Sequence, residues 1–241
     1  MNKTIDQLFD DLERMDRQDI ENKIGDGFHI GRFERDGIID EKIYYKQKIK
    51  VLFISNEANR RKGFKEDVNS KDPFDRRENF RDYKYHKEDD WPGKLRERVS
   101  CLYQVITKDF SKKPYEVADS FAFINLNKNG GEINCDIEHL KNYCKCDIFN
   151  KMLKEQISLI SPDIIIWLGC NSFDEGVPQL LGADNNNRIY INDRYVPIVR
   201  MWHTSFSRIR NNNRLGKFDN SIIDKQAYKL NCELIKIGFF K

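Results

Sequence analysis

Four short apolar runs, separated by segments with helical spacing, dominate the pattern of the chain. Each run is long enough for a buried strand, and the runs occupy residues 51–54, 121–125, 163–168 and 195–201. Between and after them lie predicted helices at residues 94–110, 148–160, 171–181 and 221–237. Strands that alternate with helices favour a parallel sheet covered on both faces. We therefore predict an α/β fold of three layers, αβα, with a central, mostly parallel four-stranded sheet.

Further elements flank this core. An amphipathic helix is predicted over residues 4–20, because one helical face carries Ile5, Leu8, Phe9, Leu12 and Met15. The sequence Asn192-Asp193-Arg194, between Arg188–Ile191 and the last strand, predicts a β-hairpin. The expected division is an N-terminal helical extension packing on the core, residues 1–47, followed by an α/β domain, residues 48–241. A charged insertion at about 60–93, dense in cations and aromatic residues, interrupts that domain and is expected to be a long loop.

Composition narrows the classes of protein that fit. The 241 residues have a net charge of +3 with 34% charged residues, so a polyanionic partner would have to meet a local basic patch. No apolar run approaches the roughly 20 residues of a membrane span, and the first residues lack the apolar core of a signal peptide. We therefore expect a cytoplasmic protein whose six cysteines are reduced thiols. A phosphate-binding glycine fingerprint, HExxH and a nucleophile elbow are all missing, which disfavours nucleoside triphosphatases, zinc proteases and serine hydrolases.

Polar residues follow each of the four predicted strands. In chain order the strand ends deliver Asn56, Glu57 and Asn59; Asn125 and Asn127; Gly169, Cys170 and Asn171; and His203, Thr204 and Ser205. In a parallel sheet these ends lie on one edge, where α/β proteins bind their ligands. Polar loops at strand ends are common, so a single such residue carries little weight. All four strand ends together, with a glutamate and a histidine among them, predict a functional site.

The motifs at these strand ends resemble those of the uracil-DNA glycosylase superfamily. The resemblance covers roughly residues 48–215 and rests on Ser55-Asn56-Glu57-Ala58-Asn59, Phe123-Ile124-Asn125, Trp167-Leu168-Gly169 and His203-Thr204-Ser205-Phe206. It implies a monofunctional DNA N-glycosylase that needs no cofactor and no metal. By resemblance, Glu57 is the catalytic carboxylate and His203 hydrogen-bonds the leaving base.

The resemblance also implies how the base is recognised, and the departures from it bear on which base that is. Base-binding candidates are Asn56, Asn59, Asn125 and Phe74, the last being one of several aromatic residues after the first motif, with Phe64, Phe80 and Trp91. The superfamily's uracil-specific members carry a tyrosine where this chain has Asn59, and that tyrosine rejects a methyl group at C5. The smaller Asn59 leads us to expect a pyrimidine enlarged at C5, such as the modified cytosines of phage DNA. A role in antiviral defence would follow from a viral base.

DNA is the expected partner, with no membrane and no obligate protein partner. Candidate DNA-binding residues are Arg60, Arg61, Ser205, Phe206, Arg208, Arg210 and Arg214. The arginines suit phosphates, and Phe206 suits a wedge that offsets the cost of flipping a base. Alternatively, Phe206 packs in the core, and Arg60 and Arg61 are simply solvent-exposed surface residues.

A cluster of metal-ligating residue types and three alternative functions complete the expectations from the sequence. Cys135, His139, Cys144 and Cys146 are metal-ligating residue types, but they contain only a Cys-x-Cys pair rather than the paired spacing of structural zinc sites, so no metal is predicted. The alternative functions are a uracil-DNA glycosylase of base excision repair, a nucleoside or nucleotide hydrolase, and a catalytically silent DNA-binding protein of the same fold. The last is considered because a glutamate is one methylene longer than the aspartate that the family motif carries.

Overall fold

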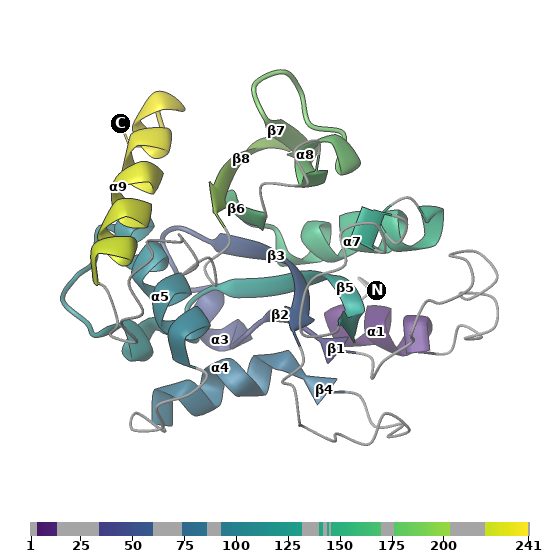
Figure 1. Ribbon diagram of the computed structural model, residues 1–241. Helices are drawn as coiled ribbons and strands as arrows, with labels where there is room; N and C mark the ends of the chain where they lie inside the picture. The colour runs from purple at the N-terminus through teal and green to yellow at the C-terminus, as the bar shows by residue number, and fades with distance from the viewer. Residues whose placement is uncertain are drawn as a thin grey trace, which may run out of the picture.

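A six-stranded sheet forms the centre of the protein in the computed structural model (Figure 1), which describes residues 4–13, 34–59, 74–85, 93–131, 140–141, 144, 146–169, 176–202 and 220–240. The strand order is β2-β5-β3-β6-β8-β7. The strands are β2 (Gly37–Ile38), β3 (Val51–Asn59), β5 (Ala122–Gly131), β6 (Ile164–Gly169), β7 (Arg188–Ile191) and β8 (Arg194–Trp202).

The four central strands, β5-β3-β6-β8, are parallel and correspond to the four predicted runs. The α/β class and the mostly parallel sheet are therefore confirmed. The predicted count of four strands was wrong, because one antiparallel strand lies beside each outer strand of the parallel set. These are β2 beside β5 and β7 beside β8. β7 is the first arm of the predicted hairpin. β2 has only two residues, which is too short to produce an alternating pattern.

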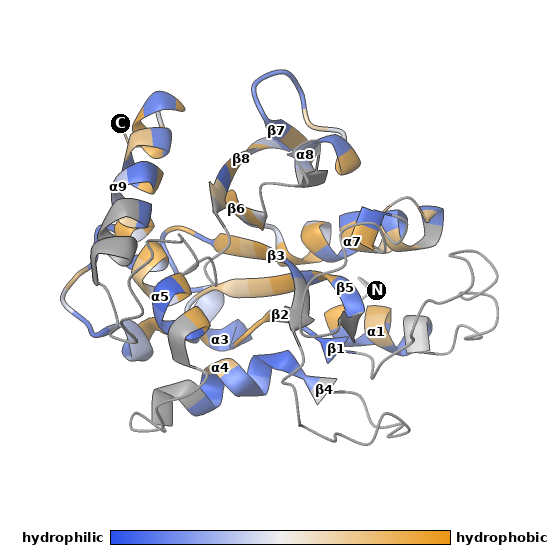
Figure 2. Cartoon of the chain, in the orientation of Figure 1, coloured by the Kyte–Doolittle hydropathy of each residue, from blue (hydrophilic) through white to orange (hydrophobic). Residues whose placement is uncertain are grey.

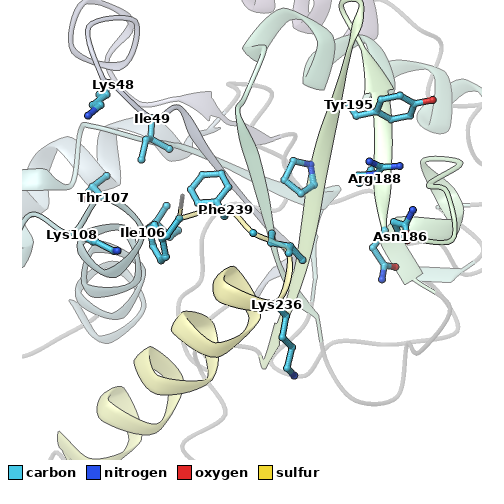
Figure 3. Close-up of a pocket in the computed structure, with 15 residues that line it drawn as sticks. Lys48, Ile49, Ile106, Thr107, Lys108, Asn186, Arg188, Tyr195, Lys236 and Phe239 are labelled. Carbon is cyan, nitrogen blue, oxygen red and sulfur yellow. The ribbon is translucent and has the colours of Figure 1, made fainter.

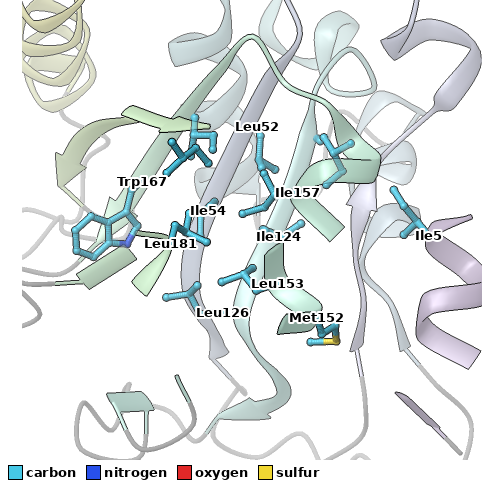
Figure 4. Close-up of a cluster of buried hydrophobic side chains, with 14 of the residues drawn as sticks. Ile5, Leu52, Ile54, Ile124, Leu126, Met152, Leu153, Ile157, Trp167 and Leu181 are labelled. Carbon is cyan, nitrogen blue, oxygen red and sulfur yellow. The ribbon is translucent and has the colours of Figure 1, made fainter. Parts of the chain in front are cut away.

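Helices cover both faces of the sheet. On one face, α1 (Ile5–Glu13) and α7 (Asp147–Ile160) pack on the strands, and their apolar residues form one core cluster with Leu52 and Ile54 of β3. Figure 4 shows Met152, Leu153 and Ile157 of α7 lying against the strands of this cluster. Helices are therefore present at residues 5–13 and 147–160, within or at the predicted segments 4–20 and 148–160, and residues 14–20 lie outside the described part.

The other face carries α5 (Gly93–Thr107) and α9 (Asn220–Lys236), which agree closely with the predicted helices 94–110 and 221–237. Val99 and Leu102 of α5 and Leu230 and Leu234 of α9 join Phe53 of β3 in a second core cluster. The buried strands are the most hydrophobic part of the chain in Figure 2. The short helix α8 (Gly176–Leu180) falls inside the predicted segment 171–181, of which residues 171–175 are not described.

The predicted loop at 60–93 contains regular structure. Its described residues form β4 (Phe74–Asp75) and α4 (Arg76–Tyr85), and β4 pairs in parallel with β1 (Glu34–Arg35) as a separate two-stranded sheet. Phe80 of α4, only 1% exposed, packs on Phe121 and Phe123. The helix was missed because it buries one aromatic ring within a sequence of mostly charged residues.

Residues 1–47 are not only helical. Besides α1 they contribute β1, β2 and the short helix α3 (Glu41–Tyr44), whose N-cap Asp40 accepts a hydrogen bond from the Ile43 N–H. The 3-10 helix η1 (Pro114–Val117) precedes β5. Among the helices in the described ranges, none combines the length and the apolar character that crossing a membrane requires.

Candidate functional site at the carboxyl edge of the sheet

The order of the parallel strands places a topological switch point at β3. The chain leaves β3 for β5 on one side, and then leaves β5 for β6 on the other side of β3. Successive crossovers that run in opposite directions open a crevice at the carboxyl ends of the strands, and ligands of α/β proteins bind there. We call this end of β5, β3, β6 and β8 the carboxyl edge.

Strand register gathers the predicted motifs at the carboxyl edge. Ser55 of β3 lies opposite both Asn125 of β5 and Leu168 of β6. The backbone of Glu57 lies opposite Asn127, and Asn59 lies opposite Gly131 after an irregularity in the pairing. The first, second and third motifs are therefore neighbours in space.

The fourth motif begins where β8 ends. Trp202, the last residue of β8, pairs with Gly169 of β6, and His203 follows it in the chain. Several predicted site residues lie outside the described part of the structure, so their positions stay predictions. These residues are Arg60, Arg61, His203, Ser205, Phe206, Arg208, Arg210 and Arg214.

Asn56 is the predicted base-binding residue with the most informative position. It is 3% exposed, and its amide oxygen Oδ1 has no hydrogen-bond partner within the described residues. Asn56 follows Ser55, and Gly169 follows the Leu168 that pairs with Ser55, so the two residues occupy equivalent positions on neighbouring strands at the switch point. A buried amide acceptor is costly to leave unpaired, and a ligand that donates a hydrogen bond would satisfy it.

Gly169 is required by the packing of Trp167. A Cβ atom on residue 169 would lie 2.5 Å from both Cε2 and Cζ2 of the Trp167 indole. Trp167 is 1% exposed, and the Arg200 guanidinium on β8 lies 5.0 Å from the centre of its ring. The Trp-Leu-Gly motif thus has a physical explanation: glycine allows the indole to fold back over the end of β6.

Asn125, predicted to read the base, is held by two acidic residues. Its backbone N–H donates to Oδ2 of Asp36 at 2.7 Å, and its side-chain Nδ2 donates to Oε2 of Glu34 at 3.3 Å. Asn125 is 2% exposed. Its amide is therefore fixed in orientation, as a residue that discriminates between bases would need to be.

Glu34 links Asn125 to the charged insertion. Its carboxylate accepts hydrogen bonds from Arg76 at 2.7 Å, from Nη2 to Oε1, and at 3.3 Å, from Nε to Oε2. Burial raises the pKa of Glu34, while Arg76 acts in the opposite direction. The backbone of Phe74, the predicted stacking residue, pairs with Glu34 in register. Phe74 and Asn125 therefore both adjoin Glu34.

A second buried charge network lies beside the first. Lys128 and Asp36 are both 0% exposed, and Lys128 Nζ lies 2.6 Å and 2.8 Å from the two carboxylate oxygens. Gln156 of α7 donates to the same carboxylate at 2.9 Å. Burial lowers the pKa of Lys128, and Asp36 opposes that shift. Asp36 therefore ties β5, α7 and the segment before β2 together beneath the carboxyl edge.

Sequence reasoning missed Glu34, Asp36, Arg76 and Lys128. Charged residues normally lie on the surface, and Asp36 meets Lys128 across 92 positions of sequence. A usable signal was Lys128 itself, which comes soon after the apolar run of a central strand and two residues after Leu126, on the same side of that strand.

The cysteine cluster is described only in part. Cys144 is buried, and burial raises the pKa of its thiol to about 12, so the thiol is protonated at neutral pH. Cys146 is half-buried at the N-cap of α7. Cys135 and His139 lie outside the described ranges. Within those ranges no group of three or more His, Cys, Asp or Glu side chains has the geometry of a metal site.

Comparison with protein families and with curated protein sequences adds no relative. Neither the protein-family models nor the curated protein sequences match the chain. The function is therefore argued from the strand-end geometry, from the buried amides of Asn56 and Asn125, and from the motifs in the sequence.

Proposed function

We propose that this chain is a DNA glycosylase of the uracil-DNA glycosylase type, which flips a modified pyrimidine out of DNA and hydrolyses its N-glycosidic bond. The observation that carries the proposal is the position of Asn56 and Glu57. They lie in the carboxyl-terminal half of β3 at the switch point, between Asn125-Leu126-Asn127 of β5 and Gly169 of β6. This is the edge where α/β folds bind ligands.

Glu57 and His203 would share the chemistry of bond cleavage. Breaking an N-glycosidic bond develops positive charge on the sugar and negative charge on the departing base. A carboxylate beneath the sugar stabilises the cation and orients water, as acidic residues do in glycoside hydrolysis. A histidine donor to the base carbonyl stabilises the anion, and such a donor is worth about 2.7–4 kcal/mol in the transition state.

The buried amides support recognition of a planar, polar ring. Asn56 offers an acceptor that has no partner in the described part of the structure, and Asn125 is fixed by Glu34 and Asp36. Asn59, in place of the tyrosine of the uracil-specific members, would leave room beside C5. The expected substrate is therefore a cytosine modified at C5, and a role in defence against phages that carry such bases follows from it.

The DNA strand would lie over the segments that follow β3 and β8. Arg60 and Arg61 come directly after β3, and Ser205, Phe206, Arg208, Arg210 and Arg214 come shortly after β8. Cations there can bind phosphates on both sides of a flipped nucleotide, while Phe206 fills the gap left in the stack.

The test is strand cleavage under alkali, which detects abasic sites. End-labelled duplexes and single strands that contain one uracil, one hydroxymethylcytosine or one glucosylated hydroxymethylcytosine are incubated with wild type, Glu57→Gln and Glu41→Gln. Glu41 is exposed on α3, away from the carboxyl edge, so its substitution is the matched control.

Cleavage at one modified cytosine, lost in Glu57→Gln and kept in Glu41→Gln, is the expected result. Cleavage at uracil alone would keep the glycosylase and replace the proposed base. If none of the three bases yields an abasic site, the glycosylase proposal fails. Retained DNA affinity in Glu57→Gln without any wild-type turnover would then indicate a silent DNA-binding protein.

A further inference from the structure

A cavity of about 1030 Å³ opens at the other end of the parallel strands. Lys48 and Ile49 line it just before β3 begins, and Tyr195 and Pro197 line it near the start of β8. We call this end of the strands the amino edge. Figure 3 shows Lys48 and Lys108 on one side of the cavity, Asn186 and Arg188 on the other, and Phe239 between them.

The cavity is positively charged. Its 15 lining residues include the cations Lys48, Lys108, Arg188 and Lys236 and no acidic side chain. Arg188 pairs with Asp184 and Lys236 pairs with Glu233, each at 2.8 Å. Lys48 and Lys108 are exposed and form no ion pair with an acidic group among the described residues. The cavity therefore keeps positive charge that an anion can neutralise.

Local helix electrostatics explain only part of this charge. Lys108 follows the last residue of α5, and Lys236 ends α9, and cations at helix C-termini are favourable by themselves. Lys48 precedes a strand and Arg188 starts one, so no helix end accounts for them. Four cations from four separate segments converge on one cavity.

The walls between the cations suit a ring. Ile49, Ile106, Pro197 and Phe239 contribute apolar surface, and the Arg188 guanidinium lies 4.7 Å from the centre of the Tyr195 ring. Asn186 also lines this cavity and adds an amide to it. Ligand sites of small molecules measure about 300–1000 Å³, so a single phosphate would leave most of this cavity empty.

We propose that the amino-edge cavity binds a nucleotide, with its phosphates on the cations and its base against the apolar wall. The chemistry is the same for a free nucleotide and for a nucleotide within a DNA strand. The site shares no residue with the carboxyl edge, so it does not depend on the glycosylase proposal. If the chain acts on DNA, this cavity would be a second contact or an effector site.

The test is isothermal titration calorimetry at 50 mM and 200 mM NaCl with ATP, adenosine and a five-nucleotide thymidine oligomer. The proteins are wild type, Lys48→Glu/Lys108→Glu, and a control with the same charge change, Lys151→Glu/Lys154→Glu. Both control lysines are exposed on α7, which lies on a different part of the molecule. Unchanged thermal unfolding shows that each variant is folded. If the Lys48→Glu/Lys108→Glu variant does not fold, Lys48→Ala/Lys108→Ala replaces it.

ATP or the oligomer should bind the wild type. Its affinity for the Lys48/Lys108 variant should be lower by roughly tenfold or more, because phosphate contacts are lost. The control variant should bind as the wild type does, and adenosine should bind much more weakly. Competition between the oligomer and ATP identifies a strand nucleotide as the natural source, and ATP binding alone identifies a free one. Absence of binding by both, or an equal loss in the control variant, overturns the proposal.

Discussion

At the carboxyl edge of the sheet Asp36 and Lys128 are buried and bonded to each other, whereas at the amino edge four cations surround an open cavity. Asp36 and Lys128 are 0% exposed, and four nitrogen-to-oxygen contacts of 2.6 to 2.9 Å converge on the Asp36 carboxylate. Lys48 and Lys108 at the amino edge are exposed. The same strands thus carry a buried ion pair at one end and exposed cations at the other.

Buried charges and exposed charges have different effects on stability and binding. Buried and fully bonded groups fix the position of their neighbours, here Asn125, but removing one partner leaves the others unpaired in a medium of low polarity. Exposed cations are screened by water and salt, and they contribute little to stability while remaining free to bind an anion. Substitutions at the carboxyl edge should therefore affect folding, and substitutions at the amino edge should affect mainly binding.

The largest expected effect is that of Asp36→Asn. The substitution keeps an oxygen for the Asn125 N–H but removes the negative charge that faces Lys128. Breaking one partner of a buried ion pair costs about 3–5 kcal/mol. We expect the free energy of unfolding, measured by urea denaturation, to fall by about that amount.

Two further variants decide whether that loss comes from the ion pair. Asp36→Asn/Lys128→Met removes both charges and should lose less stability than the sum of the two single substitutions. Asp82→Ala removes an exposed carboxylate from α4 and should change stability by less than about 0.5 kcal/mol. If the stability lost in the double variant equals the sum of the losses in the two single variants, Asp36 and Lys128 do not stabilise each other.

Gly169→Ala should have the next largest effect. The added methyl would lie 2.5 Å from two carbons of the Trp167 indole, so the ring or the end of β6 must shift. Overpacking of this kind costs about 1–3 kcal/mol. The near-UV circular dichroism of the tryptophans and the urea midpoint would both report the change.

The smaller ring of phenylalanine provides the internal control for that clash. Trp167→Phe will destabilise the protein by itself, because it removes buried surface. In the Gly169→Ala/Trp167→Phe double variant, however, the added methyl should cost less than it does beside tryptophan. An equal cost in both backgrounds would mean that the indole is not what requires glycine at this position.

Glu34→Gln tests the carboxyl edge through pH. Burial raises the pKa of Glu34 in the folded state, so above its ordinary value of 4.5 the folded protein holds this proton more tightly than the unfolded chain does. The stability contributed by Glu34 is therefore fully present below pH 4.5 and is lost as pH rises through the folded-state pKa. In urea denaturation, the advantage of wild type over Glu34→Gln should shrink as the pH rises from 4.5 towards 7.

Glu78→Gln is the matched control, because Glu78 is exposed on the same helix that supplies Arg76. Its stability should follow the pH dependence of wild type. A wild-type advantage over Glu34→Gln that instead grows with pH would show that Arg76 lowers the pKa of Glu34 more than burial raises it.

The parallel centre of the sheet was predictable because a strand buried on both faces must be apolar along its length. Val51–Ile54 and Ile164–Leu168 show this directly, and the hairpin was visible from Asn192-Asp193. The edge strand β2 was not predictable, since two residues have no period. β5 extends to Gly131, six residues beyond its predicted end, since polar residues continue a strand once a neighbour supplies hydrogen bonds.

Part of the candidate site was likewise predictable from the sequence and part was not. The strand-end motifs were predictable because each adjoins an apolar run, and Asn56 and Asn125 do lie at one edge. The acidic residues that hold Asn125 were not, because Glu34 and Asp36 are about 90 positions away in sequence and their local pattern is that of a surface segment. Burial of charge is a property of the assembled fold.

The smallest expected effect is at the amino edge, in the turn between β7 and β8. Asn192 and Asp193 have φ values of 48° and 61°, the left-handed backbone of a two-residue hairpin turn that favours Asn-Gly. Asn192 is fixed, because its amide exchanges two hydrogen bonds of 2.7 Å with Ser158 at the end of α7. Asp193→Gly relieves the strain of a side chain at positive φ and should stabilise the protein by less than about 1 kcal/mol, whereas Asp193→Ala, which keeps that strain, should destabilise it. Thermal unfolding of the two variants should therefore shift in opposite directions, and a shift of several kcal/mol in either one would show that this edge is as tightly coupled to the fold as the carboxyl edge.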